Sequence, residues 1–266
     1  MMDTQEYGRV LATVPPADIK GLTPAGDWLA IGWFTPDYRP LAETFAGNLD
    51  HYGIPHHLYA KPKLDGGGWN TLRKPSVVLE AMDAYPGKTL VLMDVDCIVR
   101  GDIAPVADIA GDVGITIIAQ NVPGRRDRRW RRGRDAEWRH WIAAECSSRV
   151  VVFRPTPGAR AFATAWQWRI DNSHVNHDEH SMVWAFLAST GSVAFSYIDK
   201  RYSGREVSDL PDGVIVHDSA HHKQIVSVRG RIKTALRSLE RQWLRSGRSR
   251  AMKHQLQAGA TKVHLG

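Results

Sequence analysis

The sequence predicts an α/β fold: one domain with a mainly parallel, Rossmann-like central sheet, followed by a basic C-terminal helix. Three observations support this prediction. Short apolar runs alternate with amphipathic segments of helical spacing, a series typical of parallel sheets with helices on both faces. One apolar run ends in two carboxylates, as ligand-binding strands often do. The length of 266 residues suits one large domain, and we expect it to cover residues 1–228 with a helical tail at 229–266.

The expected strands are short runs of apolar and β-branched residues bounded by turn residues. They lie at residues 28–34, 55–60, 89–96, 113–120, 148–155, 193–198 and 213–218. In parallel sheets, ligands bind beyond the carboxyl ends of the strands. Polar residues that follow these runs are therefore the first candidates for a functional site.

The expected helices show apolar residues three and four positions apart. They lie at residues 41–52, 75–85, 157–170 and 178–186, and at 232–243 in the tail. Gly53 is the expected stop of the first helix, and Thr156 the expected N-cap of the third. Because two of them fit helical stripes, Trp166, Trp168 and Trp184 are expected in the core.

Charge is distributed unevenly along the chain. The net charge is +7, but residues 125–134 carry seven arginines against one Asp, and residues 229–253 carry nine Lys or Arg against one Glu. The remainder is therefore acidic. This asymmetry indicates an anionic partner, although residues 125–134 also fit a solvated loop. Cys97 and Cys146 are too few for a disulfide framework, and with no apolar N-terminal leader and no expected membrane span we predict a cytoplasmic protein.

Asp94 and Asp96 follow the apolar run "TLVLM" with one residue between them. An unpaired buried carboxylate is so unfavourable that such groups are paired, protonated or bound to a metal. Residues two apart in a strand lie on one face, so both carboxylates of D-x-D are able to reach one cation. Mg²⁺ or Mn²⁺ is the expected ion, because both prefer oxygen ligands and bridge carboxylates to phosphates. The alternative is a strand end with two solvated acids.

Six segments resemble, in their order, those of the GT-A family of nucleotide-sugar glycosyltransferases, particularly the glycogenin-like and nucleotide-diphospho-sugar transferase groups. They are "WFTPDY", "TLRKPSVVLEAM", "VLMDVDCIVRGDI", "SSRVVVFRP", "NHDEHSMVWAF" and "VIVHDSAHHK". The resemblance covers about residues 28–223. Two departures concern the sugar and phosphate contacts. Ser147 and Ser148 replace the usual Asn-Gly, and after His217 an alanine, Ala220, takes the expected glycine position, with the lysine one residue late.

The resemblance implies roles for particular residues of this chain. Asp94, Asp96 and His217 are the implied metal ligands, and Asp178 and Glu179 the implied catalytic residues. The implied donor-binding residues are Thr35, Tyr38, Arg73, Lys74, Asp94, Ser147, Ser148 and Lys223. An aromatic side chain such as Tyr38 is able to stack on a nucleotide base.

The resemblance implies an enzyme that depends on Mn²⁺ or Mg²⁺ and moves a sugar, hexose-like, from a nucleotide-diphosphate donor, with UDP favoured. It leans towards a retaining reaction, but an inverting one stays open. For the acceptor we expect a polyanion, with a modified base in DNA as the most specific version and a cell-surface glycan or lipid as the alternative. The arginine run interleaved with tryptophan suits phosphates and bases. Its expected contact residues are Arg128, Arg129, Trp130, Arg131 and Arg132.

Two other classes use parts of the same pattern. HAD-type phosphatases also carry D-x-D after an apolar strand, but there the motif opens the domain, whereas here about ninety residues precede it. A non-enzymatic nucleic-acid-binding protein would account for the basic segments but would leave the D-x-D and "VIVHDSAHH" without a purpose. Donor hydrolysis with nucleotide sugars, with and without Mn²⁺, distinguishes these classes from a transferase.

Overall fold

The computed structural model describes residues 17–22, 26–63, 70–119, 144–172, 178–204 and 212–217. The chain divides into two compact units, Met1–Asp218 and Ser219–Gly266. Every described residue belongs to the first unit. The expected boundary at residue 228, the basic C-terminal helix and the arginine run at 125–134 lie outside the described residues and stay predictions.

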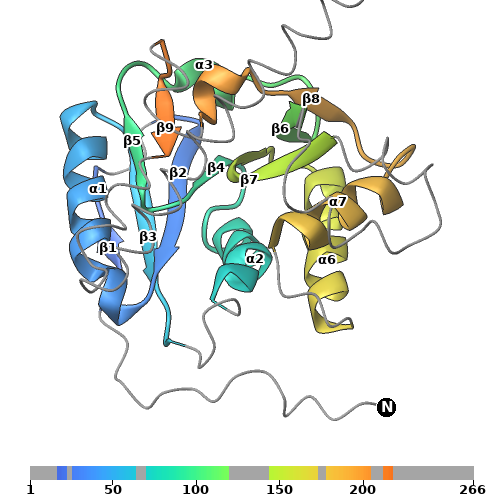
Figure 1. Ribbon diagram of the computed structural model, residues 1–266, viewed down its shortest axis with the longest axis horizontal. Helices are drawn as coiled ribbons and strands as arrows, with labels where there is room; N and C mark the ends of the chain where they lie inside the picture. The colour runs from blue at the N-terminus through green and yellow to red at the C-terminus, as the bar shows by residue number, and fades with distance from the viewer. Residues whose placement is uncertain are drawn as a thin grey trace, which may run out of the picture. The chain divides into compact units, whose positions relative to one another are not determined.

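The first unit is built on a seven-stranded sheet of order β1-β3-β2-β4-β7-β6-β8 (Figure 1). The strands are β1 (Ile19–Lys20), β2 (Trp28–Phe34), β3 (His56–Ala60), β4 (Thr89–Met93), β6 (Val113–Ala119), β7 (Ala144–Phe153) and β8 (Phe195–Tyr197). Strands β2, β3, β4, β6 and β8 point in one direction, whereas β1 and β7 run opposite to their neighbours. The predicted α/β class with a mainly parallel sheet is confirmed, and the antiparallel β7 is its main irregularity.

Both faces of the sheet are buried, which explains the continuous apolar runs in the sequence. Successive strand residues point to opposite faces. Leu29 and Ile31 of β2 therefore pack into one hydrophobic cluster, and Ala30 between them packs into the other. β4 follows the same rule, with Leu92 in the first cluster and Val91 in the second.

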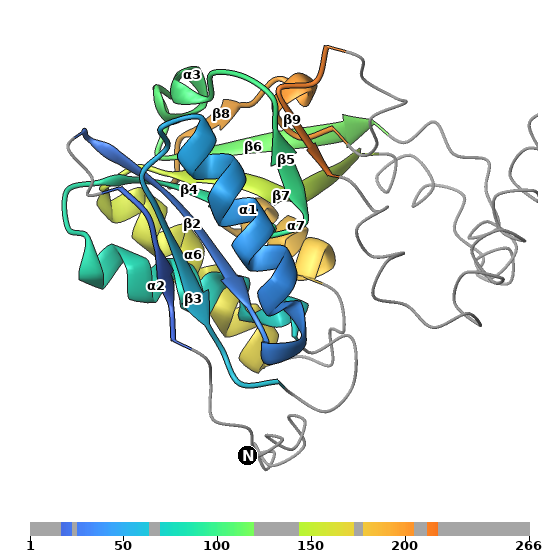
Figure 2. The same cartoon turned by 90° about the vertical axis from the view of Figure 1, so that its left-hand side faces the viewer.

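Four longer helices among the described residues cover these two faces. They are α1 (Arg39–His51), α2 (Lys74–Ala84), α6 (Pro157–Asp171) and α7 (Asp178–Ala188). Phe45 and Leu49 of α1 pack into one cluster, while α2, α6 and α7 contribute to the other. Figure 2 shows α1 in front of the sheet with α2 and α6 behind it. Shorter turns of helix are η2 (Pro36–Tyr38), η3 (Thr71–Arg73), α3 (Ala104–Ala107) and η4 (Lys200–Tyr202).

The local helix signals act as predicted at two positions. Gly53 adopts a positive φ of 65° just after α1, a conformation that glycine reaches without strain. At α6, the Thr156 hydroxyl accepts a hydrogen bond from the Ala159 amide at 3.1 Å, with Pro157 in the first turn. The core prediction holds for Trp166, which is fully buried, but was wrong for Trp168, which is 52% exposed. Trp168 instead stacks on Trp184, which is partly buried and packs against the core cluster.

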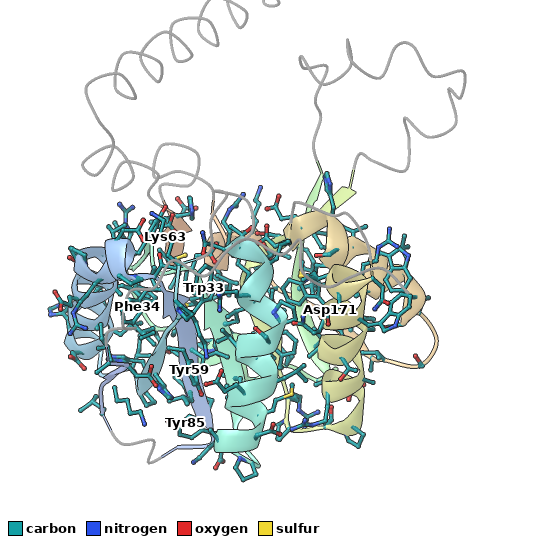
Figure 3. The ribbon with its side chains drawn as sticks, turned by 90° about the horizontal axis from the view of Figure 1, so that it is seen from below. Trp33, Phe34, Tyr59, Lys63, Tyr85 and Asp171 are labelled. Atoms are coloured by element: carbon teal, nitrogen blue, oxygen red, sulfur yellow. The ribbon has the colours of Figure 1, made fainter. Side chains whose placement is uncertain are left out.

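The carboxyl ends of β2, β3 and β4 meet at one edge of the sheet. Figure 3 shows Lys63, which follows β3, at this edge, and Tyr85, which follows α2, at the opposite edge. A separate two-stranded ribbon pairs β5 (Cys97–Val99) with β9 (Ile215–His217) in antiparallel fashion. Among the described helices, none combines the length and apolar character needed to cross a membrane.

Candidate active site

Asp94 and Asp96 flank a tight turn that directly follows β4. The strand ends at Met93. The amide of Asp94 donates to the Arg149 carbonyl of β7 at 3.1 Å, and the Cys97 amide donates to the Asp94 carbonyl at 3.0 Å. The extended backbone therefore breaks between the two carboxylates, just beyond the end of β4.

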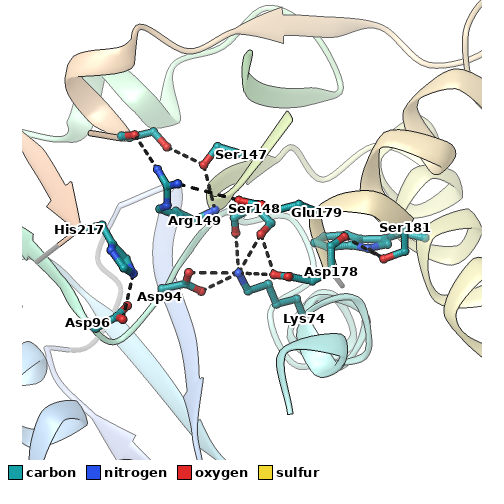
Figure 4. A network of polar contacts seen from close by, with 12 residues as sticks. Lys74, Asp94, Asp96, Ser147, Ser148, Arg149, Asp178, Glu179, Ser181 and His217 are labelled. Atoms are coloured by element: carbon teal, nitrogen blue, oxygen red, sulfur yellow. Dashed lines mark hydrogen bonds and ion pairs between the residues drawn. The ribbon is translucent and has the colours of Figure 1, made fainter. Parts of the chain in front are cut away.

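His217 reaches the same place from the far end of the described chain. The ribbon register pairs His217 with Cys97, the residue after Asp96. His217 Nε2 lies 2.9 Å from an Asp96 carboxylate oxygen (Figure 4). Ligand atoms from Asp94, Asp96 and His217 all lie within 4.8 Å of one another. The structure thus brings together the three residues that the sequence analysis singles out as metal ligands.

The donor set of this cluster fits a hard or borderline divalent ion. Two carboxylates suit Mg²⁺ and Mn²⁺ alike. An imidazole nitrogen as third donor favours Mn²⁺ over Mg²⁺, which is bound through oxygen. Burial raises the pKa of Asp94 to about 6, and the nearby carboxylates of Asp96 and Asp178 add to this effect against the opposing charge of Lys74. A cation between these oxygens would relieve that repulsion.

Lys74, on the first turn of α2, is enclosed by polar groups from three other segments. Its ammonium lies 2.8 Å from the carboxylates of both Asp94 and Asp178. It also donates to the carbonyl and to the hydroxyl of Ser148, each at 3.0 Å. Burial alone would lower the pKa of Lys74, but the two carboxylates more than offset burial and raise it. Lys74 therefore stays charged and holds Asp94, and these contacts occupy the ammonium that the sequence analysis assigns to the donor.

Asp178 and Glu179 are the first two residues of α7, where the helix dipole favours negative charge. Asp178 is buried and accepts a hydrogen bond from Ser148 at 2.7 Å in addition to its ion pair with Lys74. Burial raises the pKa of Asp178, but Lys74 and Ser148 outweigh burial and lower it. Glu179 is more exposed, with its carboxylate 4.0 Å from the Arg149 guanidinium. The two neighbouring acids therefore occupy different environments.

Thr35 and Tyr38 lie on the turn that follows β2. Thr35 is buried, and its hydroxyl donates to the Asp37 carboxylate at 2.7 Å. Burial raises the pKa of Tyr38 to about 12, and the charges of Asp96, Asp37 and Asp94 contribute. Tyr38 is thus within electrostatic reach of the carboxylate cluster, whereas the described contact of the Thr35 hydroxyl is a local turn contact.

Arg73 and the two serines complete the described donor candidates. Arg73 is half-buried at the end of η3, where burial lowers its pKa, and its Nε has no hydrogen-bond partner among the described residues. Ser147 accepts from the Ser203 hydroxyl at 3.1 Å, so it faces the η4 segment. Ser148 contacts Lys74 and Asp178, as given above. The two serines therefore point to different sides of β7.

Comparison with known proteins depends on structure alone. No protein-family model and no curated protein matches this sequence. Among solved structures, the chain is similar to a glycosyltransferase involved in the glycosylation of the major capsid of PBCV-1, with a TM-score of 0.52 and 12% identity, over 72% of this chain and 93% of that chain. The chain has a GT-A-type glycosyltransferase fold.

Two further solved structures are similar at lower scores. GlyE of Streptococcus pneumoniae, a glycosyltransferase, has a TM-score of 0.43 and 11% identity, over 76% of this chain and 55% of that chain. The galactosyltransferase LgtC has a TM-score of 0.43 and 12% identity, over 71% and 86%. The GT-A assignment rests on the first structure and on the topology described above.

Arg149 is a residue of this candidate site that the sequence analysis does not single out. Its guanidinium lies near Glu179 (Figure 4), and it donates to the Ser203 carbonyl. A signal was present, because Arg149 opens the otherwise apolar run "VVVF" of β7, and a charged residue inside a buried strand needs a partner. Lys223 and the expected acceptor residues of the 125–134 run lie outside the described residues.

Proposed function

We propose that this chain is a divalent-metal-dependent glycosyltransferase that moves a sugar from a nucleotide-diphosphate donor, with UDP favoured, to an acceptor. The observation that carries the proposal is the Asp94–Asp96–His217 cluster at the carboxyl edge of a GT-A sheet. Ligands of open α/β sheets bind at this edge. Mn²⁺ or Mg²⁺ is the proposed cofactor, and it would supply neutralisation of the charge that develops on the departing diphosphate.

The described side chains have separate roles in the proposed reaction. Asp94, Asp96 and His217 hold the ion, and Lys74 fixes the orientation of Asp94 through its contacts with both carboxylate oxygens. Tyr38, near the same carboxylates, is placed to stack on the base of the nucleotide. Thr35 and Arg73 lie on segments that lead to this edge and stay proposed donor contacts.

Glu179 is the better placed of the two candidate catalytic acids. The Asp178 carboxylate is committed to Lys74 and Ser148, and its lowered pKa makes it a weak base. Glu179 is more exposed at the same helix start. In an inverting reaction Glu179 takes the proton of the acceptor hydroxyl. In a retaining reaction the departing phosphate takes that proton, and Glu179 contacts the sugar.

For the acceptor, we propose a polyanion, with a modified base in DNA as the most specific version. This part is supported by the charge of residues 125–134 and 229–253. A cell-surface glycan or lipid is the alternative. The alternative of a HAD-type phosphatase is disfavoured, because β1, β2 and β3 precede the D-x-D motif and the sheet has GT-A topology.

The test is hydrolysis of UDP- and GDP-sugars by the full chain, with and without Mn²⁺. We expect hydrolysis of one donor class that requires metal, and its loss by at least about 100-fold in Asp96→Asn, because a metal-ligand change removes charge stabilisation of the leaving group. Asp108→Asn, which neutralises an exposed carboxylate after α3, is the matched control and should retain full activity. Metal-independent hydrolysis, or equal activity of both variants, would refute the proposed function.

A further inference from the structure

Arg149 occupies a central position in the candidate active site. Its carbonyl accepts the hydrogen bond from the Asp94 amide at 3.1 Å. Its guanidinium reaches Ser203, and the next residue, Gly204, accepts the His217 amide at 2.9 Å. Arg149 therefore lies between the two segments that carry the metal cluster. Burial raises the pKa of the Cys97 thiol, and the charges of Asp94 and Asp96 raise it further. The charges of Lys74 and Arg149 oppose this effect, so all four groups lie near the thiol.

The guanidinium of Arg149 is buried but poorly satisfied by its described partners. The side chain is only 9% exposed. Its hydrogen bond to the Ser203 carbonyl is 3.5 Å long, and its carboxylate partner Glu179 lies 4.0 Å away. Charge-assisted hydrogen bonds normally measure about 2.7–2.9 Å. A buried cation with two long contacts keeps N–H donors for a further anionic partner.

The other cation of the described site is not available in the same way. Lys74 is 3% exposed and already contacts two carboxylates and both oxygens of Ser148. Among the described residues, Lys74 pairs with Asp94 and Asp178, whereas Arg149 has one long contact with Glu179. A diphosphate that binds beside the ion would add negative charge next to these carboxylates, and a cation with available N–H groups would offset it.

We propose that Arg149 binds the diphosphate of the nucleotide donor, through the fork of N–H groups that suits phosphate oxygens. In this assignment Arg149 takes the donor-binding role that the sequence analysis gives to Lys74, and Lys74 positions Asp94. Arg149 also holds Glu179 and the η4 segment until the donor binds. The inference rests on the proposed function, because it requires a nucleotide-diphosphate donor at the metal cluster.

The experiment is titration calorimetry of UDP and GDP, in MnCl₂, on the full chain and its variants. Arg149→Met keeps the aliphatic bulk and removes the charge, and we expect its diphosphate affinity to fall by about tenfold to about 100-fold. Arg149→Lys keeps the charge but not the fork and should lose less. In Arg149→Met, the affinity for UMP, which carries one phosphate fewer, should fall less than the affinity for UDP.

A purely structural role for Arg149 predicts a different pattern. It would lower the unfolding temperature of the ligand-free Arg149→Met protein and weaken UDP and UMP equally, and this result would overturn the proposal. Arg154→Met is the matched control. Arg154 directly follows the last residue of β7, is half-buried and donates to the Ala110 carbonyl at 3.0 Å. Its loss should leave UDP binding unchanged.

The failures of the two proposals are distinguishable. Equal, metal-dependent UDP or GDP binding by the wild type and by Arg149→Met would overturn the role of Arg149 and leave the donor site standing. The absence of any nucleoside diphosphate binding by the wild type in MnCl₂ would overturn the donor site itself, and the role of Arg149 with it.

Discussion

The carboxyl group of Asp94 illustrates how a single residue couples protons to metal. Burial and the carboxylates of Asp96 and Asp178 raise its pKa from 3.8 to about 6, despite the contact with Lys74. In the metal-free protein this raised pKa contributes stability that is fully present below the unfolded value of 3.8 and lost as pH rises through about 6. A metal ligand must be deprotonated, so the proton and the ion compete for the same oxygens.

Metal affinity should therefore depend on pH. We expect the affinity for Mn²⁺ to fall by about tenfold per pH unit below about pH 6, measured by titration calorimetry from about pH 8 to about pH 5. Asp108→Asn removes an exposed carboxylate and should leave the profile unchanged. An affinity that stays constant across this range would show that Asp94 is not a ligand.

At the scale of elements, Lys74 connects four segments that are distant in the sequence. Its ammonium joins α2 to the turn after β4, to β7 and to the start of α7. These contacts set the distance between the metal cluster and the candidate catalytic acids. Ionic groups buried in this way are costly to leave unpaired.

Lys74→Met should destabilise the fold by about 3–5 kcal/mol, because it leaves Asp94 and Asp178 buried without their cation. Urea denaturation measures the change in the free energy of unfolding. Lys63→Met, which removes a half-exposed ion pair with Asp37, should cost at most about 1 kcal/mol. Lys74→Met combined with Asp178→Asn should be less destabilised than Lys74→Met alone. If Lys74→Met is no less stable than Lys63→Met, the enclosed lysine does not hold these elements together.

At the scale of the whole chain, acidic and basic regions are separated along the sequence. The metal cluster lies in the acidic remainder, whereas residues 125–134 and 229–253 carry the positive charge. An acidic remainder that carries the candidate metal site, with basic segments elsewhere in the sequence, fits the proposed polyanionic acceptor.

Binding to duplex DNA should fall steeply between about 50 mM and about 200 mM salt, because phosphate contacts release counterions. Fluorescence anisotropy measures it on the full chain. Changing Arg128, Arg129, Arg131 and Arg132 to Ser should weaken binding to any sequence and flatten the salt slope. Donor hydrolysis should be largely spared, since these arginines are not proposed donor ligands. Equal and negligible DNA binding by both proteins would leave a glycan or lipid as the acceptor.

Interactions between residues close in the sequence account for the structural features that the sequence determined by itself. Side-chain period, turn residues and caps act over a few residues, so the strands, the α1 stop at Gly53 and the α6 cap at Thr156 could be predicted. The position of Asp94 and Asp96 at a strand end follows from the same run of residues. Their placement with His217 needed the family resemblance as well, because nothing local links residues so far apart.

Only the tertiary structure decided the properties that depend on which elements pack together. The pairing of β7 with β4 and the packing of α7 on β7 bring Arg149 to Glu179 and Ser203, and Ser148 to Lys74 and Asp178. Lys74, which in the sequence is simply a lysine before a helix, is enclosed because the turn after β4, β7 and the start of α7 all meet at its ammonium. Trp168 shares a helix with the buried Trp166 but is exposed, because helical spacing alone does not define the width of the covered face. Burial and charge pairing arise between segments, so no local pattern contains them.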